Sequence, residues 1–223
     1  PHTSQTDHRI IRRPTSEKPV PAPPAMTVFD GAADRLPRIE VERGLGLVMA
    51  PLASSRNDPF LARRADAYLE TARAAAPDDV EVLESLATVR ALQGRTGEAI
   101  DLLREALKLD PDRESALVAL AAACSEAGRN EEGVEALGRL FEVNPWHAEF
   151  HELHATMLAR LGRTNEAIRA AERALELDPS LRDVCLLLAD LHRQRGDAER
   201  GESYRQRAAK LPVLPRYSVR GLR

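Results

Sequence analysis

Prolines and glycines recur along most of the chain at one fixed interval, and this interval constrains the fold more than any other feature. Four prolines follow one another at steps of 34 residues: Pro77, Pro111, Pro145 and Pro179. Four glycines repeat at the same step, about midway between the prolines: Gly94, Gly128, Gly162 and Gly196. A period of this length is typical of a protein built from stacked copies of one small structural unit.

Each unit is predicted to be a pair of α-helices. The residues between the markers are mainly Ala, Leu, Glu and Arg, which favour helices. The glycine is expected to end the first helix and the proline to follow the end of the second. Small residues recur where paired helices would cross, on the first helix at Ala87, Ala121, Ala155 and Ala189 and on the second at Ala99 and Ala167.

The 34-residue period, with Leu, Ala, Gly, Ala and Pro at fixed places, resembles the tetratricopeptide repeat family. This resemblance implies an all-α, right-handed superhelical solenoid of antiparallel helix pairs, about four to five repeats long. Three full units are predicted over 78–111, 112–145 and 146–179, and a fourth over 180–211. A degenerate unit precedes them, with helices predicted from about Arg38 to Ala53 and from Leu61 to Ala76.

Composition divides the chain into three parts. Residues 1–36 are predicted to be an extended arm and Pro-rich linker, because prolines are dense there and large apolar side chains are few. Residues 37–211 form the predicted repeat solenoid, and residues 212–223 are predicted to be a basic C-terminal tail. Since the chain opens on Pro1 rather than Met, we expect a processed product or a fragment.

Charge and composition argue against several classes of function. The net charge of −3 gives no positive field for nucleic acid, and no apolar run approaches the length of a membrane span. Cys124 and Cys185 are too few for a disulfide scaffold or a zinc site, and both are predicted to be buried and inert. Neither a Ser-His-Asp set nor a phosphate-binding loop stands out, so we predict that the chain is not an enzyme.

The concave side of such a solenoid is lined by the first helix of each pair and is the expected partner-binding groove. The residues predicted to line it are mainly acidic: Glu81, Glu84, Glu126, Glu149, Glu152, Arg160, Asp183 and Asp190, together with Thr88, Ser115, Val118, Thr156 and Arg193. A groove of this sign favours a basic or neutral partner segment. The alternative is that these acids form a solvated surface with no partner.

Three histidines lie close together at the start of the third unit. His147, His151 and His154 have the i, i+4, i+7 spacing that places residues on one side of a helix, as in some metal sites. However, His151 and His154 occupy positions where the other repeats carry Leu or Cys. We therefore favour core histidines packed beside Trp146 and Phe150 over metal ligands.

The first thirteen residues are not repeat sequence and contain two further histidines. His2 and His8 are followed by a basic cluster ending at Arg13. Neutral imidazoles can ligate a metal or a haem iron, and arginines can pair with an anion. The alternative from the residues themselves is a solvated arm with incidental histidines.

The run from His2 through Thr6-Asp7-His8-Arg9-Ile10 to Arg13-Pro14, before a Pro-rich linker and a repeat array, resembles the C-terminal part of a family of bacterial multihaem c-type cytochromes. That resemblance implies that His2 and His8 are distal axial ligands of c-type haem iron, and that the protein is periplasmic or extracellular. Because the chain has no Cys-x-x-Cys-His motif, haem c would be contacted but not attached by it. The implied partner is a haem-bearing cytochrome domain or chain.

Three functional hypotheses follow. In the first, the chain is a non-catalytic repeat scaffold of a multihaem cytochrome electron-transfer assembly, with the arm supplying histidine ligands. In the alternative, it is a free-standing adaptor without haem that binds a peptide or a partner subunit. In a third, the basic tail, with Arg216, Arg220 and Arg223, meets the acidic groove of another copy, giving self-assembly.

Overall fold

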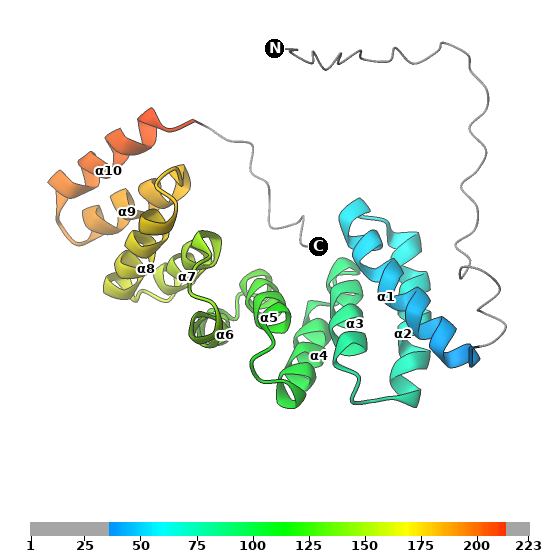
Figure 1. The fold of residues 1–223 in the computed structure, drawn as a ribbon. Coiled ribbons are helices and arrows are strands. Elements are labelled where there is room, and N and C mark those ends of the chain that lie inside the picture. Colours follow the sequence, from blue (N-terminus) through cyan, green and yellow to red (C-terminus); the bar gives the residue numbers. More distant parts are fainter. Residues whose placement is uncertain (1–35, 213–223) are drawn as a thin grey trace, which may run out of the picture.

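The computed structural model describes residues 36–212, which form ten α-helices and no strand. The helices are α1 (Arg38–Arg56), α2 (Pro59–Ala75), α3 (Val80–Leu92), α4 (Thr96–Leu109), α5 (Glu114–Ala127), α6 (Asn130–Val143), α7 (Ala148–Arg160), α8 (Thr164–Leu177), α9 (Arg182–Gln194) and α10 (Ala198–Lys210). They stack as five consecutive antiparallel pairs in a curved row (Figure 1). The prediction of an all-α solenoid of helix pairs is confirmed.

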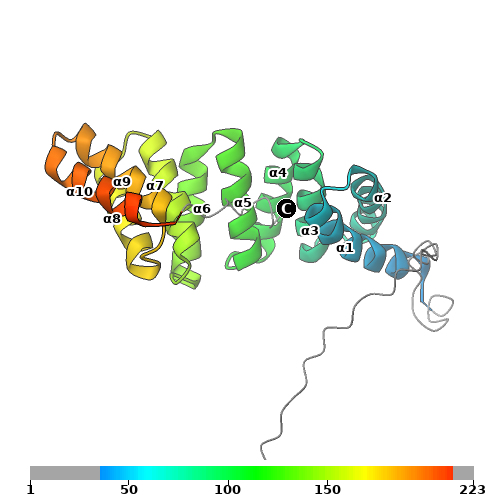
Figure 2. The ribbon, with the colours of Figure 1, turned by 90° about the horizontal axis from the view of Figure 1, so that it is seen from above.

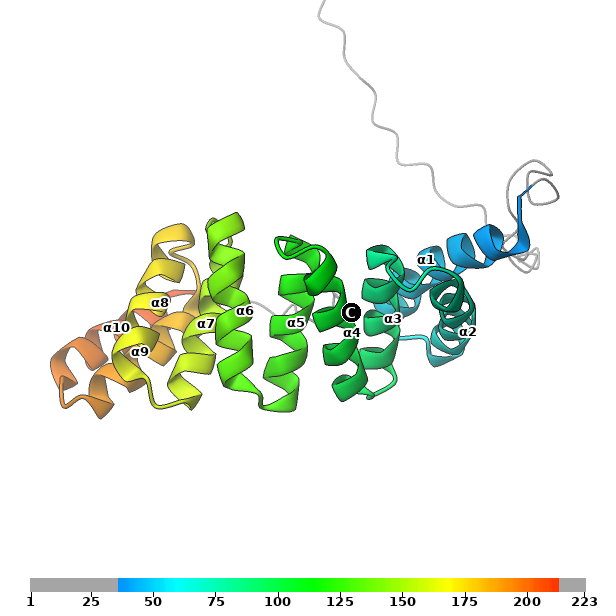
Figure 3. The ribbon, with the colours of Figure 1, turned by 90° about the horizontal axis from the view of Figure 1, so that it is seen from below.

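Seen from above and from below, the helix pairs follow one another in chain order along one elongated row (Figures 2 and 3). Each helix packs mainly against its partner in the pair and against the next pair along the chain. Such a stack has neighbour contacts but no contact between distant repeats, so its stability is set repeat by repeat.

The turns explain why the glycines and prolines recur. All four repeated glycines have positive φ, between 71° and 82°, which L-amino acids with a side chain rarely adopt. Gly128, for example, ends α5 in the left-handed conformation and donates its N–H to the carbonyls of Cys124 and Ser125. The residues before the prolines are extended, with ψ of 83° for Ala76 and 99° for Asp178, as expected before proline.

Small residues allow the paired helices to cross closely, as predicted. Ala87, Ala121, Ala155 and Ala189 are each at most 1% exposed. On the second helices the equivalent positions are occupied by Ala99, Gly133, Ala167 and Gly201. A Cβ at Gly201 would lie 2.9 Å from the carbonyl oxygen of Ala189, so α9 and α10 are in backbone contact there.

The first pair departs from its predicted boundaries. We predicted a first helix from about Arg38 to Ala53, but α1 continues to Arg56 and ends at Asn57, whose φ is +50°. The second helix begins at Pro59 rather than Leu61. The reason is local: Asp58 accepts hydrogen bonds from the N–H groups of Phe60 and Leu61, and proline is favourable in the first turn of a helix.

The apolar core is divided into two clusters. The larger runs from α1 into α7 and ends at Phe150 and Met157, while the smaller begins at Ala155 on α7 and reaches Ala208 on α10. The division falls at the third unit, which carries the histidines. Almost all of the predicted arm and of the C-terminal tail lies outside the described residues.

Candidate partner-binding face

The first helices of the pairs lie on the inner side of the curved row. Neighbouring first helices approach one another, α1 with α3, α3 with α5 and α7 with α9. Figure 1 shows α5 and α7 on the inner side of the arch, with α4 and α6 on the outer side. We call the surface formed by α3, α5, α7 and α9 on this side the concave face.

The predicted groove residues all lie on these first helices. Glu81 and Glu84 are on α3 and Glu126 is on α5; Glu149, Glu152 and Arg160 are on α7, and Asp183 and Asp190 are on α9. Glu81, Glu126, Glu149, Arg160 and Asp190 are exposed, whereas Glu84, Glu152 and Asp183 are half-buried. Their use as partner contacts stays a prediction.

Several of these carboxylates are already paired across repeat boundaries. Glu84 accepts hydrogen bonds from the Arg113 Nε atom at 2.8 Å and from the Ser115 hydroxyl at 2.5 Å, both from the following repeat. Sequence reasoning placed Glu84 on the inner side, but it did not anticipate these partners. The acidic surface is therefore partly neutralised by arginines of the same chain.

The same arrangement joins α1 to α3. The Arg43 guanidinium contacts Asp79 at 2.5 Å and Glu81 at 2.8 Å, and Asp79 also accepts the N–H of Val82 at the start of α3. Burial works to raise the pKa of Asp79, but the hydrogen bonds from Arg43 and Val82 outweigh it and lower that pKa. The carboxylate is thus held in its charged form as a link between two repeats.

Two neighbouring positions in the middle of the concave face are apolar. On α5, Val118 and Ala122 occupy the two repeat positions that hold Glu84 and Thr88 on α3, and both are half-buried. The Thr88 hydroxyl donates to the Glu84 carbonyl at 3.0 Å, so it is occupied within its own helix. The concave face therefore presents a small apolar patch, Val118 and Ala122, between more acidic neighbours.

The histidines of the third unit belong mainly to the packing between α6, α7 and α8. His151 is buried, its Nε2 lies 3.0 Å from the Pro145 carbonyl oxygen, and its ring stacks on Phe141 with centroids 4.0 Å apart. Burial lowers the pKa of the half-buried His154 to about 4. Their expected neighbour Trp146 is instead 70% exposed, with the Arg173 guanidinium 5.6 Å from its ring centroid.

Among the described residues, no group of three or more His, Cys, Asp or Glu side chains is placed to hold a metal ion. A cavity of about 280 Å³ adjoins the histidines and is lined by Phe141, His151, His154, Leu158, Glu166, Arg169, Ala170 and Arg173. With burial lowering the pKa of both rings, the imidazoles His151 and His154 favour the neutral form.

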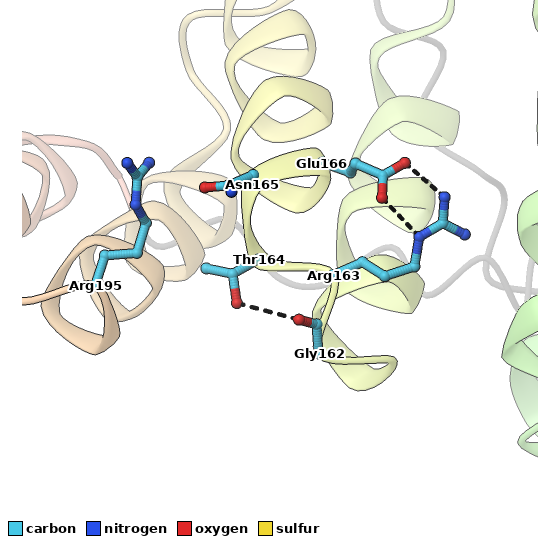
Figure 4. A pocket seen from close by; sticks show the side chains of 6 residues that line it. All are labelled: Gly162, Arg163, Thr164, Asn165, Glu166 and Arg195. Atoms are coloured by element: carbon cyan, nitrogen blue, oxygen red, sulfur yellow. Dashed lines mark hydrogen bonds and ion pairs between the residues drawn. The ribbon is translucent and has the colours of Figure 1, made fainter.

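A second hollow, of about 490 Å³, lies at the edge of the solenoid where α7 turns into α8 (Figure 4). Arg163 donates to the Glu166 carboxylate at 2.7 and 2.5 Å, and Arg195 approaches from the next turn along the edge. Arg163 and Glu166 offset each other's charge, and Arg195 is the remaining charged residue of the lining. The hollow is also on an edge rather than on the concave face.

The two cysteines are buried, as predicted. Both Cys124 and Cys185 are fully enclosed, and burial raises the pKa of the Cys124 thiol to about 12. A thiol with so high a pKa is not a nucleophile at neutral pH.

One buried charge was missed by sequence reasoning. Arg90 on α3 is 6% exposed and its guanidinium contacts Asp66 at 2.8 Å, Glu98 at 3.2 Å, and Glu70. These carboxylates come from α2 and α4, so Arg90 joins the first two helix pairs. Only the repeat position of Arg90 signalled its burial in the sequence, because the equivalent position in the later units holds Cys124, Leu158 and His192.

The two predicted haem ligands lie outside the described residues. His2 and His8, the expected haem ligands, precede residue 36, as does the whole Thr-Asp-His motif. Within residues 36–212, the helices are all too short or too polar to cross a bilayer.

Comparison with known sequences identifies the repeats. One tetratricopeptide repeat model matches residues 62–114 and 153–215, which is more than half of the chain, and a second matches residues 90–157. The matched segments together cover the interval from α2 to the end of α10. No curated protein matches the sequence.

Solved structures of MamA share the fold. MamA of AMB-1 is 24% identical, covers 78% of this chain and 91% of its own, and superposes with a TM-score of 0.71. MamA of MSR-1 is also 24% identical, with coverage of 78% and 95% and a TM-score of 0.69. A double mutant of MamA of RS-1 is 17% identical, with coverage of 78% and 93% and a TM-score of 0.68. At these identities the likeness concerns the fold.

Proposed function

Because the chain belongs to the tetratricopeptide repeat family, we propose that it is a non-catalytic adaptor whose concave face binds a short segment of a partner protein. The observation that supports this is the apolar patch of Val118 and Ala122 at the centre of that face. It offers a place for one apolar side chain, with acidic residues on both sides.

The partner segment is expected to be neutral or basic next to that apolar side chain. Glu149 is exposed on the neighbouring first helix α7 and gives the surroundings of the patch a negative sign, whereas the exposed Glu81 is already paired with Arg43 at 2.8 Å. Glu84 contributes less, because Arg113 and Ser115 already occupy its oxygens. Shape and burial at the patch therefore supply affinity, and the exposed acids supply selectivity.

This proposal is tested with synthetic peptides in which a central Leu is flanked by Lys, by Ser or by Glu. We expect the Lys and Ser peptides to bind the full chain and the Glu peptides to bind at least about tenfold more weakly, because like charges oppose one another. Ala122→Arg should abolish binding by filling the patch. Gly138→Arg on the outer helix α6 is the matched control, since a Cβ there meets no atom within 4 Å.

Equal binding of all three peptides, or binding that survives Ala122→Arg, would overturn the concave-face proposal. Circular dichroism and thermal unfolding of both arginine variants show whether the fold is kept. A change in binding counts only where the variant unfolds at the same temperature as the unmodified chain.

The Thr-Asp-His sequence motif favours a second candidate, in which His8, and with it His2, ligates c-type haem iron of a cytochrome partner outside the cytoplasm. We propose testing it by titrating the full chain with a haem-bearing peptide whose iron has an open coordination position. A shift of the Soret band that is lost in His8→Ala and retained in His147→Ala would support the role. Identical Soret spectra for the unmodified chain, His8→Ala and His147→Ala would overturn the haem-ligand proposal.

A further inference from the structure

Helix α1 is apolar on two sides. From Gly44 to Ala53 it carries no polar side chain. One side, with Met49, Ala50 and Ala53, is buried in the core. The other holds Gly44, Val48 and Pro51 at spacings that place them on one face, and all three are exposed, Val48 by 57%.

We call this second side the α1 outer stripe: Val41, Gly44, Leu45, Val48, Pro51 and Leu52. A helix that is apolar all round is normally buried all round. Among the described residues, α1 packs mainly on α2 and α3. The most exposed residues of the outer stripe, Gly44, Val48 and Pro51, therefore lack a full cover within residues 36–212.

The last helix shows what a finished end looks like in the same molecule. Of the residues of α10, Gly201 and Ala208 are buried, and the exposed positions are mostly charged or polar, among them Glu199, Arg200, Glu202, Arg205 and Lys210. A terminal repeat with a polar outer surface needs no cover. This polar surface also does not complement an apolar stripe, so stacking the first helix of one copy on the last helix of another is not favoured.

We propose that the segment Met26–Phe29 of the same chain packs on the α1 outer stripe and covers it. The segment Met26-Thr27-Val28-Phe29 has three large apolar side chains and is followed by Asp30-Gly31, a dipeptide that favours a turn. In the sequence the segment closely precedes the stripe, because the described chain begins at Leu36 and α1 begins at Arg38.

The lengths agree. Leu36 is seven positions after Phe29, and an extended chain of that length reaches about 24 Å. Val48 is ten positions after Arg38 on the helix, which is about 15 Å along the axis. After a turn at Asp30-Gly31, the apolar segment can therefore reach Val48 without strain.

Disulfide trapping tests this arrangement in the full chain. Thr27→Cys and Gly44→Cys place one thiol in the segment and one on the stripe without removing an apolar side chain, and a Cβ at Gly44 meets no atom within 4 Å. The native thiols Cys124 and Cys185 are buried and do not compete. Under mild oxidation we expect a monomer with an internal disulfide, seen by mobility on a non-reducing gel and by mass.

A flexible tether alone would also bring the two thiols together at times, so a matched control is needed. Val28→Ser with Phe29→Ser, in the same two-cysteine chain, keeps the tether length and removes the apolar contact. We expect internal disulfide formation to slow at least about tenfold. An unchanged rate would overturn the proposal, because proximity would then explain the bond.

A single Gly44→Cys chain distinguishes the other occupant. If that variant forms disulfide-linked dimers faster than the two-cysteine chain forms its internal bond, the stripe pairs with a second copy and the proposal is wrong. Hydrogen exchange of the unmodified chain gives an independent readout. The amides of α1 should be at least about tenfold better protected than in Val28→Ser with Phe29→Ser, and equal protection would contradict the proposal.

Discussion

The helix pair α1–α2 and the helix pair α9–α10 terminate the same repeat array with different chemistry. The first pair buries large core side chains, including Met49 and Leu69, and leaves apolar residues on its outside. The last helix buries only a glycine and an alanine and is polar outside. The first pair is thus firmly attached and incompletely covered, whereas the last helix is well solvated and weakly attached.

This contrast predicts which end of the array unfolds locally first. Local unfolding begins where few apolar contacts would be lost, so α10 should exchange its amides before α2 or α3 does. One repeat position shows the contrast directly. Arg90, near the first pair, is held by carboxylates from two neighbouring helices, while its counterpart His192 is buried with neither ring nitrogen in a hydrogen bond. The predictions below test this contrast from the largest effect to the smallest.

Arg90→Leu should give the largest loss. The substitution leaves Asp66, Glu70 and Glu98 together without their cation. Removing one partner of a buried ion pair strongly destabilises the fold, because the remaining charge stays buried without compensation. We expect the free energy of unfolding, from urea denaturation, to fall by about 3 kcal/mol. Arg95→Leu, which also loses a contact to Glu98 but is exposed, is the control and should change far less. Equal effects would mean that the buried cluster does not secure the first pair.

Mild acid should loosen the middle of the array before the N-terminal end. The pKa of His154 is about 4 in the folded chain against 6.5 in the unfolded chain, so the unfolded state takes up the proton more readily between these values. Stability is therefore full above pH 6.5 and is lost as the pH falls toward 4. Allowing for solvent screening, we expect a loss of about 1–2 kcal/mol.

His154→Leu should reduce that dependence to the part that His151 contributes, because burial lowers the pKa of His151 as well. Leu fits this position, since three other repeats carry it there (Leu86, Leu120 and Leu188). Urea unfolding at pH 7 and at pH 4.5 compares the two proteins. The link between Arg43 and Asp79 should persist over this range, because the pKa of Asp79 is lowered below 3.8 and its contribution is lost only as the pH falls through that lowered value. If His154→Leu loses as much unfolding free energy between pH 7 and pH 4.5 as the unmodified chain, His154 is not the source of the acid sensitivity.

Gly201→Ala should weaken the last pair by about 1–2 kcal/mol. The added Cβ would meet the Ala189 carbonyl oxygen at 2.9 Å, a backbone atom that cannot turn aside, which outweighs the better helix propensity of alanine. Hydrogen exchange in α10 is the measurement. Gly138→Ala, where the Cβ meets nothing, is the control and should stabilise α6 by about 0.5–1 kcal/mol. If both changes stabilise, the contact between α9 and α10 is looser than the structure shows.

His192→Leu should act in the opposite direction to Arg90→Leu at the same repeat position. It replaces buried ring nitrogens that have no hydrogen-bond partner with an apolar side chain like that of Leu158. We expect a gain of about 1 kcal/mol, seen as slower exchange in α9 and α10. A loss would show that the contact of His192 with Asp197, at 3.7 Å, or its stacking on Tyr204 stabilises the C-terminal end.

The sequence was sufficient for those features that depend on local structure. The interval between Gly94 and Gly128 marked each turn because that backbone conformation needs glycine, and Leu at equivalent positions showed that His151 faces inward. The end of α1 was placed three residues too early, because serines that favour turns can also continue a helix when Asn57 and Asp58 supply the caps.

Features that join separate repeats could not be predicted in this way. Arg90 has the residue type of a surface position, and its burial depends on carboxylates that come from two other helices. The stacking of Phe141 on His151, rather than of Trp146, depends on the crossing of α6 and α7. The acidic residues of the concave face were assigned to the correct helices, but pairs such as Arg113 with Glu84 depend on side-chain reach across a boundary.

The ion pairs between repeats also bear on how a chain of near-identical modules finds one arrangement. Neighbouring copies could dock out of order during synthesis, which is a known hazard for repetitive chains. Here two boundaries have different ion pairs: Arg43 with Asp79 joins the first helix pair to the second, while Arg113 with Glu84 and Arg104 with Glu132 join the second to the third. A module docked against the wrong neighbour would leave such charges unmatched. Ion pairs that differ between boundaries thus favour the correct neighbour over a wrong one. They help to specify the order of the modules in the folded state.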